Sequence, residues 1–266
     1  MLSIGIDVAD QTFTASACTA DFEVLFYGQT FAQTSAGYTA FSHLLATLPH
    51  PLTAAVMIME ATGVYSERLS HYLFQQGFTV CVEPPLAIKK GLYERAKTDP
   101  VDSRQIAEYA FRFPDRLHPW SPPTEILDQL KTLVTAREQF AKMLTACKNA
   151  RHAVQRKQYP HPVTVAYYDQ LISKVTGWIE ALEGDMRTVI QTNPRLAQTL
   201  QYVQAIPNVG FLLAVNVALV TEGFQQYVRY QSLAKYIGTC PLPYQSGTSV
   251  YRRPSGDGAG PARLRK

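Results

Sequence analysis

The stretch LSIGIDVADQTFTASACTADFEVLFYGQTF, residues 2–31, decides the fold class, because it holds three apolar runs separated by turns. The first run, LSIGIDVAD, ends in an acid, and the runs TFTASACTA and EVLFYGQTF flank a turn at Asp21. Runs of this length on either side of a turn are typical of neighbouring strands. The chain is therefore predicted to open with three strands connected as hairpins.

Helix and strand patterns alternate after these strands, as far as about Arg116. The patterns are those of a helix in GYTAFSHLLATL, a buried strand in TAAVMIME, a helix stopped by Gly77 in VYSERLSHYLFQQG, and a strand in FTVCVEP. Strands that alternate with helices indicate a layered α/β sheet. Residues 1–116 are accordingly predicted to form one α/β domain.

The next segment, residues 117–194, is predicted to hold a linker and two long helices. The stretch FPDRLHPWSPPT, with its four prolines, has the composition of a linker. Two heptad seams follow, and they favour an antiparallel coiled-coil hairpin about 40–50 Å long. The seam positions are Ile126, Leu130, Leu133, Arg137, Phe140, Leu144, Cys147, Arg151 and Val154, then Ile172, Val175, Ile179, Leu182, Met186 and Val189.

Two of these seam positions carry arginine, Arg137 and Arg151. An arginine in a seam costs stability unless it pairs or reaches solvent. The two residues are therefore predicted to set the register or the partner of the hairpin, or to contact RNA.

Residues 195–266 are predicted to form a third, mainly α-helical domain. In AIPNVGFLLAVNVALVTEGF, Pro207 and Gly210 stand between two helical patterns. The turn is similar to a helix-hairpin-helix turn that binds phosphate, although proline and glycine also punctuate ordinary helices. Tyrosines beside basic residues could stack on bases or pack in the fold. They are Tyr227, Tyr230, Tyr236, Tyr244 and Tyr251.

The composition is that of a folded, mildly basic protein. Hydrophobic residues make up 46% of the 266 residues, charged residues 17%, and the net charge is +4. No apolar run is long enough for a membrane span, and the start has no signal-peptide pattern. Four cysteines without CxxC spacing indicate free thiols in a reducing cytoplasm and disfavour zinc.

The basic residues concentrate in two parts of the chain. Residues 131–157 contain seven Lys/Arg and one acid, Glu138, and residues 246–266 contain five Lys/Arg and one acid, Asp257. Such stretches suit the phosphate backbone of a nucleic acid, and a solvated helix face is the alternative.

Four acids stand at the ends of predicted elements. Asp7 ends the first strand, Glu60 ends the buried strand, and Asp99 and Asp102 open a helix in KTDPVDSRQIA. Acids in a first helical turn also complement the helix dipole, which is the structural alternative. Clustered carboxylates repel unless a cation lies between them, and oxygen ligands without histidine favour Mg²⁺ or Mn²⁺. Asp10, on a predicted turn past the strand, is a weaker candidate.

Several motifs carry a resemblance to a known family. IGID, MEATGVY, KTDPVDSRQIA, AIPNVG and SLAKYIGTCPLPYQSGT, in this order, resemble the DEDD-type insertion-sequence transposases of the IS110 family. The resemblance implies a RuvC-like, RNase H-type fold for residues 1–116, with Asp7, Glu60, Asp99 and Asp102 as a metal-binding tetrad. It also implies a C-terminal transposase domain whose Ser-Gly motif supplies a nucleophile, Ser246.

The resemblance further implies an enzyme that cleaves and exchanges DNA strands through a serine–phosphate intermediate. Its partners would be donor and target DNA, a structured bridge RNA, and further copies of the chain in a dimer or tetramer. The protein would be located in the bacterial cytoplasm and would associate with the nucleoid while it acts on DNA. The candidate nucleic-acid contacts are Lys97, Arg137, Lys148, Arg151, Arg252 and Arg253.

The chain departs from the family pattern in two respects. It stops at Lys266, so the C-terminal domain is expected to be cut short, and Gln245 precedes the candidate serine. Ser249 and Ser255 are the alternative nucleophiles.

Three alternative functions remain. One is a Mg²⁺-dependent junction resolvase or nuclease without a covalent intermediate, and another is a non-catalytic RNA- or DNA-binding scaffold. Sugar kinases and actin-like ATPases also begin with GID, but their glycine-rich phosphate loops have no counterpart in this sequence.

Overall fold

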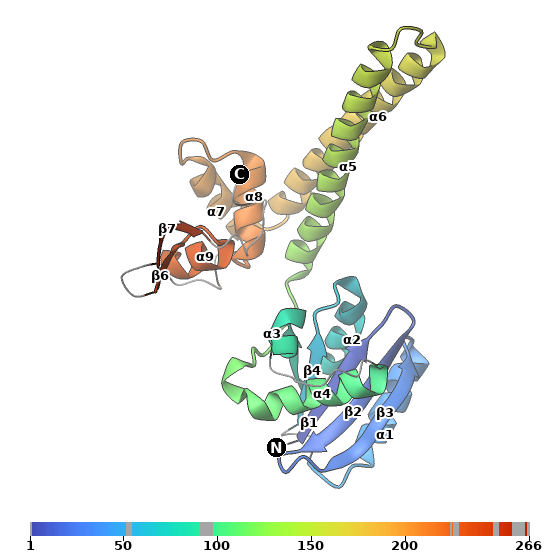
Figure 1. Cartoon of the computed structure of the whole chain (residues 1–266), viewed down its shortest axis with the longest axis vertical. Coiled ribbons are helices and arrows are strands. Elements are labelled where there is room, and N and C mark those ends of the chain that lie inside the picture. Colours follow the sequence, from blue (N-terminus) through green and yellow to red (C-terminus); the bar gives the residue numbers. More distant parts are fainter. Residues whose placement is uncertain are drawn as a thin grey trace. The chain divides into compact units, whose positions relative to one another are not determined.

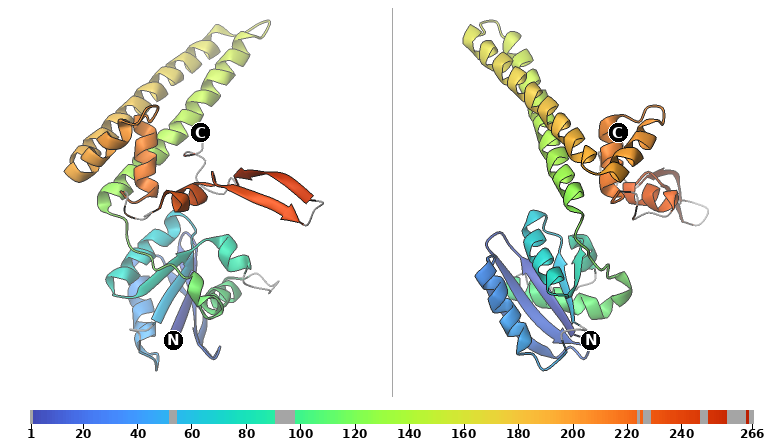
Figure 2. Two further views of the ribbon diagram at one scale, coloured as in Figure 1. Left: turned by 90° about the vertical axis from the view of Figure 1, so that its left-hand side faces the viewer. Right: turned by 180° about the vertical axis from the view of Figure 1, so that it is seen from behind.

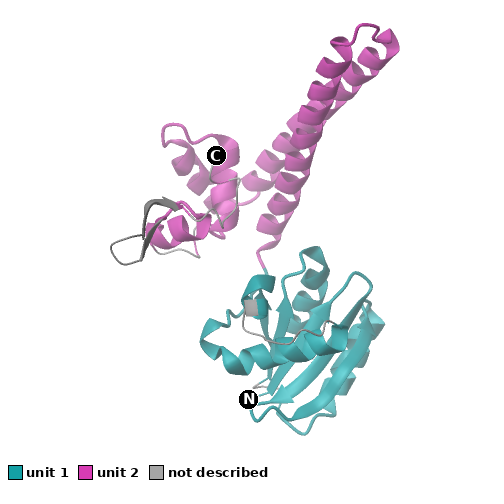
Figure 3. Cartoon of the chain, in the orientation of Figure 1, with its two compact units in different colours: residues 1–122 teal, residues 123–266 magenta. Residues whose placement is uncertain are grey.

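The computed structural model describes residues 2–51, 55–90, 98–223, 225, 229–246, 250–256 and 264. For residues 90, 242–246 and 250–255 it describes the backbone alone. The chain divides into two compact units, residues 1–122 and 123–266 (Figure 3). The boundary falls inside the proline-rich stretch, and the three-part division expected from the sequence stays a prediction.

Unit 1 is built on a five-stranded sheet in the order β3-β2-β1-β4-β5 (Figure 1). The first three strands pair antiparallel, whereas β4 and β5 run parallel to β1. The expected α/β sheet with three hairpin-connected strands is thus confirmed. The strands are β1 (Leu2–Val8), β2 (Thr12–Thr19), β3 (Val24–Ala32), β4 (Ala55–Glu60) and β5 (Thr79–Glu83).

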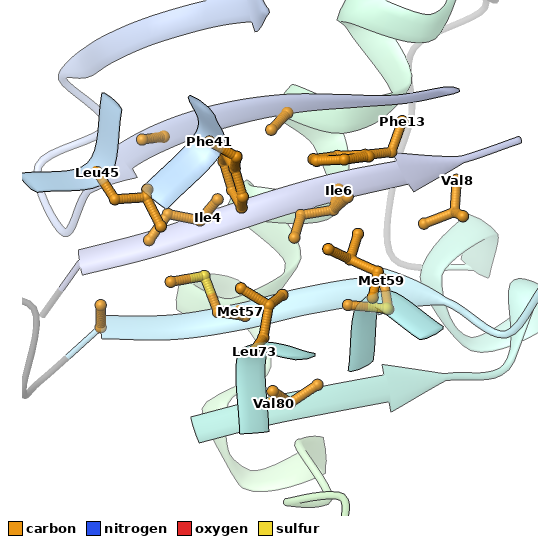
Figure 4. Packing of buried hydrophobic residues seen from close by; sticks show 14 of the residues in the cluster. Ile4, Ile6, Val8, Phe13, Phe41, Leu45, Met57, Met59, Leu73 and Val80 are labelled. Carbon is orange, nitrogen blue, oxygen red and sulfur yellow. The ribbon is translucent and has the colours of Figure 1, made fainter. Parts of the chain in front are cut away.

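Helices cover both faces of this sheet. The helices are α1 (Ser35–Ala46), α2 (Val64–Gln75), α3 (Pro85–Lys90) and α4 (Asp99–Arg112), followed by the 3-10 turn η2 (Pro114–Arg116). Helices α1 and α2 pack on one face, where Phe41 and Leu73 meet Ile4 and Met57 of the strands (Figure 4). Helix α4 packs on the other face, where Ile106 joins Ile58.

Gly5 allows α4 to approach the sheet closely. A Cβ at this position would lie 2.1 Å from the Ser103 carbonyl oxygen and 2.2 Å from the Ala107 nitrogen. Because only glycine lacks a Cβ, only glycine permits this contact between β1 and the helix backbone.

The proline-rich stretch after α4 packs on the edge of the sheet. The Trp120 N–H donates to the Val80 carbonyl over 2.7 Å, and Pro119 forms a bridge with Cys81. The Trp120 ring lies against His71 and Phe74. This segment therefore belongs to the core of unit 1 as far as Trp120.

Unit 2 contains two long helices followed by shorter elements. In every view α5 and α6 lie side by side and are joined by a short turn (Figures 1 and 2). The elements are α5 (Glu125–Gln155), α6 (Pro162–Gln191), α7 (Pro194–Gln204), α8 (Phe211–Val220), α9 (Tyr230–Ile237), and the antiparallel strands β6 (Pro241–Ser246) and β7 (Val250–Gly256).

The predicted seam positions of α5 and α6 are all buried or half-buried. Arg137 pairs with Glu183 over 3.0 Å, and Arg151 pairs with Asp169 over 2.5 Å. The two pairs are fourteen residues apart on each helix, so one antiparallel alignment satisfies both. The heptad geometry of a coiled coil stays a prediction.

The base of this hairpin, formed by the start of α5 and the end of α6, shares a hydrophobic core with α7 and α8. Leu130, Met186, Leu200 and Val215 are buried together in this core. None of the described helices is long and apolar enough to cross a membrane.

Candidate active site

The carboxyl ends of three neighbouring strands carry acids. The parallel pairing of β1 with β4 runs from Leu2 opposite Ala55 to Ile6 opposite Met59. One step further along this register, Asp7 stands beside Glu60. Glu60 itself is paired with Glu83 of β5. Ligands of parallel sheets gather at this carboxyl edge.

Asp7 and Glu60 project from the face that α4 covers. Side chains alternate between the two faces of a strand. Gly5 lies under α4, and Ile58 packs against Ile106 of that helix. Asp7 and Glu60, each two residues further on, therefore share the α4 face.

Polar contacts hold the start of α4 against the sheet. The Ser103 hydroxyl lies 2.8 Å from the Ser16 hydroxyl of β2 and also donates to the Pro100 carbonyl over 3.0 Å. The Ser16 hydroxyl accepts a hydrogen bond from the Gly28 N–H of β3. The first turn of α4, which contains Asp99 and Asp102, is thereby fixed over strands β2 and β3.

The side of α4 that carries Asp102 faces the acidic edge. Residues four apart lie on the same side of a helix, so Asp102 shares a side with Ile106, which packs on β4. Phe111, on the opposite side, meets Phe22 at the other end of the sheet. Asp102 is half-buried and Asp99 is exposed.

The structure brings Asp7 and Glu60 next to each other on the sheet and places Asp102 on the side of α4 that faces this edge. Within the described parts of the chain, no three His, Cys, Asp or Glu side chains are grouped so that they could hold a metal ion. Glu60 pairs with Lys89 of α3, whose Nζ lies 3.7 Å from Oε1. The donor set is all carboxylate oxygen, which suits Mg²⁺ or Mn²⁺ rather than zinc.

Glu83 is an acid of this edge that the sequence analysis missed. It is only 2% exposed, and its Oε1 accepts the His118 N–H over 2.8 Å. The His118 Nδ1 lies 3.4 Å from the same oxygen. The signal was present, because the apolar run of FTVCVEP closes with an acid, Glu83, just as that of TAAVMIME closes with Glu60.

Burial and the Glu83 charge also shape the neighbouring groups. Burial, and then the negative charge of Glu83, raise the pKa of the Cys81 thiol to about 11. The same two causes raise the pKa of the Tyr109 hydroxyl. Cys81 therefore stays a neutral thiol at neutral pH.

The predicted nucleophile lies in unit 2. Ser246 is the last residue of β6 and pairs with Val250 of β7, and its side chain lies outside the described atoms. Ser249 lies outside the described residues, and Ser255 is described by its backbone in β7.

The predicted nucleic-acid contacts fall into three groups. Arg137 and Arg151 are engaged in the ion pairs between α5 and α6, whereas Lys148 is exposed on α5. Arg252 and Arg253 are described by their backbone in β7, and Lys97 lies outside the described residues.

Two family models match this chain, and both are models of transposases. Residues 200–266 match the model described as "Transposase IS116/IS110/IS902 family", and residues 4–160 match a model described as "Transposase", that of the IS110 DEDD enzymes. Transposase models thus match most of the chain, and its α/β sheet carries acids at the carboxyl edge. Together these findings define the chain as a transposase. The chain belongs to the IS110 family of transposases.

The chain is also similar to curated relatives and to solved structures. Pilin gene-inverting proteins of Moraxella lacunata and Moraxella bovis are 26% and 25% identical over 265 residues, which is 98% of this chain and 79% of each relative. Thermus thermophilus RuvC, solved alone and with a Holliday junction substrate, aligns with 45% of this chain. The TM-scores are 0.34 and 0.35, the identities are 12% and 13%, and the alignments cover 100% and 99% of RuvC.

Proposed function

We propose that this transposase cleaves and exchanges DNA strands by means of a metal-binding carboxylate edge in unit 1 and a serine nucleophile, Ser246, in unit 2. The observation that carries the proposal is the placement of Asp7 beside Glu60, on the face where the first turn of α4 supplies Asp99 and Asp102.

The carboxylates would hold Mg²⁺ or Mn²⁺ at the DNA phosphate. When bound, such ions polarise a phosphodiester and stabilise charge on its oxygens. Lys89 adds positive charge beside Glu60, with its Nζ 3.7 Å from Oε1. Like charges at one edge repel, so a cation is the condition under which Asp7, Glu60 and Asp102 can draw together.

Ser246 would carry the covalent step. Its hydroxyl oxygen attacks phosphorus, the serine–phosphate bond forms, and the bond to one DNA oxygen breaks. The departing oxygen takes up a proton, so a DNA hydroxyl is released while the phosphoester is retained. A hydroxyl from another strand then reverses the step and joins the new partners. Serine is weakly nucleophilic at neutral pH, which explains a need for an activating site.

Sequence choice would come from a structured bridge RNA that pairs with donor and target DNA. When base pairing with an RNA selects the sequence, the protein needs to recognise only the backbone and the shape of the nucleic acid. Lys148, exposed on α5, suits such a contact better than Arg137 or Arg151, because both arginines already pair with acids. Assembly into a dimer or tetramer is part of the same proposal.

A covalent-adduct assay tests the proposed function. The full chain is incubated with its RNA, Mg²⁺ and junction-bearing DNA, and protein–DNA adducts are resolved by denaturing electrophoresis. Ser246→Ala is expected to abolish the adduct and keep RNA binding, and Asp7→Asn is expected to abolish adduct and cleavage. Asp21→Asn, an exposed acid on the turn between β2 and β3, is the matched control and should retain both.

Other outcomes would favour the alternatives. Metal-dependent cleavage that is lost in Asp7→Asn but unchanged in Ser246→Ala indicates a resolvase or nuclease. Nucleic-acid binding without any effect of either change indicates a non-catalytic scaffold.

A further inference from the structure

A pocket of about 400 Å³ lies at the same edge of the sheet as the candidate active site. Asp10 of its lining follows Asp7 by three residues, and Val64 follows Glu60 by four, so the chain keeps both within roughly 15 Å of the acids. The lining residues are Asp10, Gln33, Val64, Tyr65, Glu67 and Arg68.

The pocket and the acids belong to opposite faces of this edge. Helix α2, which supplies Val64 and Tyr65, packs through Leu69 and Leu73 on the face opposite α4. Gly63, with φ +73°, turns the chain from β4 into this helix. A DNA strand whose phosphate lies at Asp7 could therefore turn one base across the edge.

Gln33 fixes the walls of the pocket. Its side-chain amide donates to the Ala9 carbonyl over 3.2 Å and to the Tyr65 carbonyl over 3.0 Å. Its Oε1 accepts the Tyr38 hydroxyl over 2.7 Å. One side chain thus joins the β1–β2 turn, the start of α2 and helix α1, so that the pocket is formed before any ligand enters.

The lining chemistry selects an uncharged, flat ligand. Val64 is 70% exposed and Tyr65 45% exposed, so both offer apolar surface to a ligand. Two carboxylates, Asp10 and Glu67, stand against the single cation Arg68. The excess of negative charge disfavours a phosphate. A nucleic-acid base fits better, because its apolar face can stack on tyrosine and its polar edges can contact the charged side chains.

We propose that this pocket holds one unpaired base of the DNA strand whose phosphate lies at the Asp7–Glu60 edge, with the base stacked on Tyr65. The inference rests on the proposed function and adds to it a positioning site for the reacting nucleotide. Binding of that base would fix the adjacent phosphate in place. The base would have to unstack from its neighbours in the DNA strand, which costs free energy.

The proposal is tested by removing single bases from the DNA and measuring only the binding affinity. The full chain is titrated, in the presence of Ca²⁺, with branched DNA that contains a short unpaired segment. A series of these DNA molecules carries one abasic site each, at successive positions of the segment. In the wild type, one position is expected to lose about tenfold in affinity, which is the effect of losing one aromatic stack. Tyr65→Ala should bind intact DNA about tenfold more weakly and show no position dependence, whereas Tyr65→Phe should behave as the wild type.

Tyr27→Ala is the matched control, because Tyr27 of β3 is 46% exposed and lies outside the pocket. It should keep the wild-type profile. An abasic profile that is flat in the wild type, or unchanged in Tyr65→Ala, overturns the proposal. A position-dependent profile that appears only with the RNA version of the strand overturns the assignment to DNA. A loss of self-association in Tyr65→Ala, with an unchanged profile, assigns the surface to a second copy of the chain.

The test separates this proposal from the proposed function. It measures affinity without cleavage, so Ser246→Ala should keep the abasic profile even though it loses the adduct. A normal adduct with a flat abasic profile removes the base pocket and leaves the strand-exchange proposal intact.

Discussion

At Gly5 the absence of a side chain determines where α4 lies. The Ser103 oxygen and the Ala107 nitrogen occupy the space of a Cβ, at 2.1 and 2.2 Å from it. Both are backbone atoms, so neither can turn aside as a flexible side chain could. The position of the first turn of α4, and hence of Asp102, therefore depends on a single glycine in β1.

Gly5→Ala is expected to lower the free energy of unfolding by about 3 kcal/mol, the upper part of the range for an overpacked core. Urea unfolding followed by circular dichroism measures the change. Gly177→Ala, at an exposed position of α6 with nothing within 4 Å of its Cβ, is the control. It should gain about 0.5–1 kcal/mol from the better helix propensity of alanine. A Gly5→Ala protein as stable as the wild type would contradict the close helix–sheet contact.

The candidate site could be predicted from sequence in part. Asp7 and Glu60 each end a strand pattern, and parallel strands align their carboxyl ends, so their adjacency follows from local periodicity. The Gln33 contacts with Ala9 and Tyr65 and the Glu83–His118 contact join residues 24 or more apart in the chain. Such contacts depend on how the strands and helices pack, and no short-range pattern encodes them.

Among the elements, the α5–α6 hairpin shows how charges inside a seam can align two helices. Arg137 with Glu183 and Arg151 with Asp169 require the same antiparallel register. The sequence predicted both helices from their apolar spacing and left open whether the arginines set register or met RNA. Pairing partners on a helix 18 to 46 residues away could not be chosen from spacing alone.

A charge swap tests whether Arg137 sets this register. Arg137→Glu places two acids against each other and should lower the free energy of unfolding by about 1 kcal/mol, since the pair is only partly shielded from water. Adding Glu183→Arg restores an opposite-charge pair and should return most of the loss. Thermal unfolding of the single and double variants measures both effects. If the double variant is no more stable than the single one, the pair does not define the register.

Each hydrophobic core that the described residues form lies within one of the two units. The cores on both faces of the sheet draw on residues up to Trp120, whereas the core at the base of the hairpin draws on Ile126 to Leu219. Under the proposed function, the carboxylates belong to unit 1 and Ser246 to unit 2. The catalytic groups would therefore be held by two cores that can respond separately to mutation.

Paired core mutations test this independence by hydrogen exchange. Leu200→Ala removes a side chain that is 2% exposed in the unit 2 core and should destabilise that unit by about 2–5 kcal/mol. Amide exchange is expected to accelerate in α5 to α8 and to stay unchanged in strands β1, β4 and β5, because local stability follows the cooperative unit that opens. Gly5→Ala should give the reverse pattern. Acceleration in both units after either mutation would show that the two cores unfold as one, and Asp7 and Ser246 would then share a single cooperative scaffold.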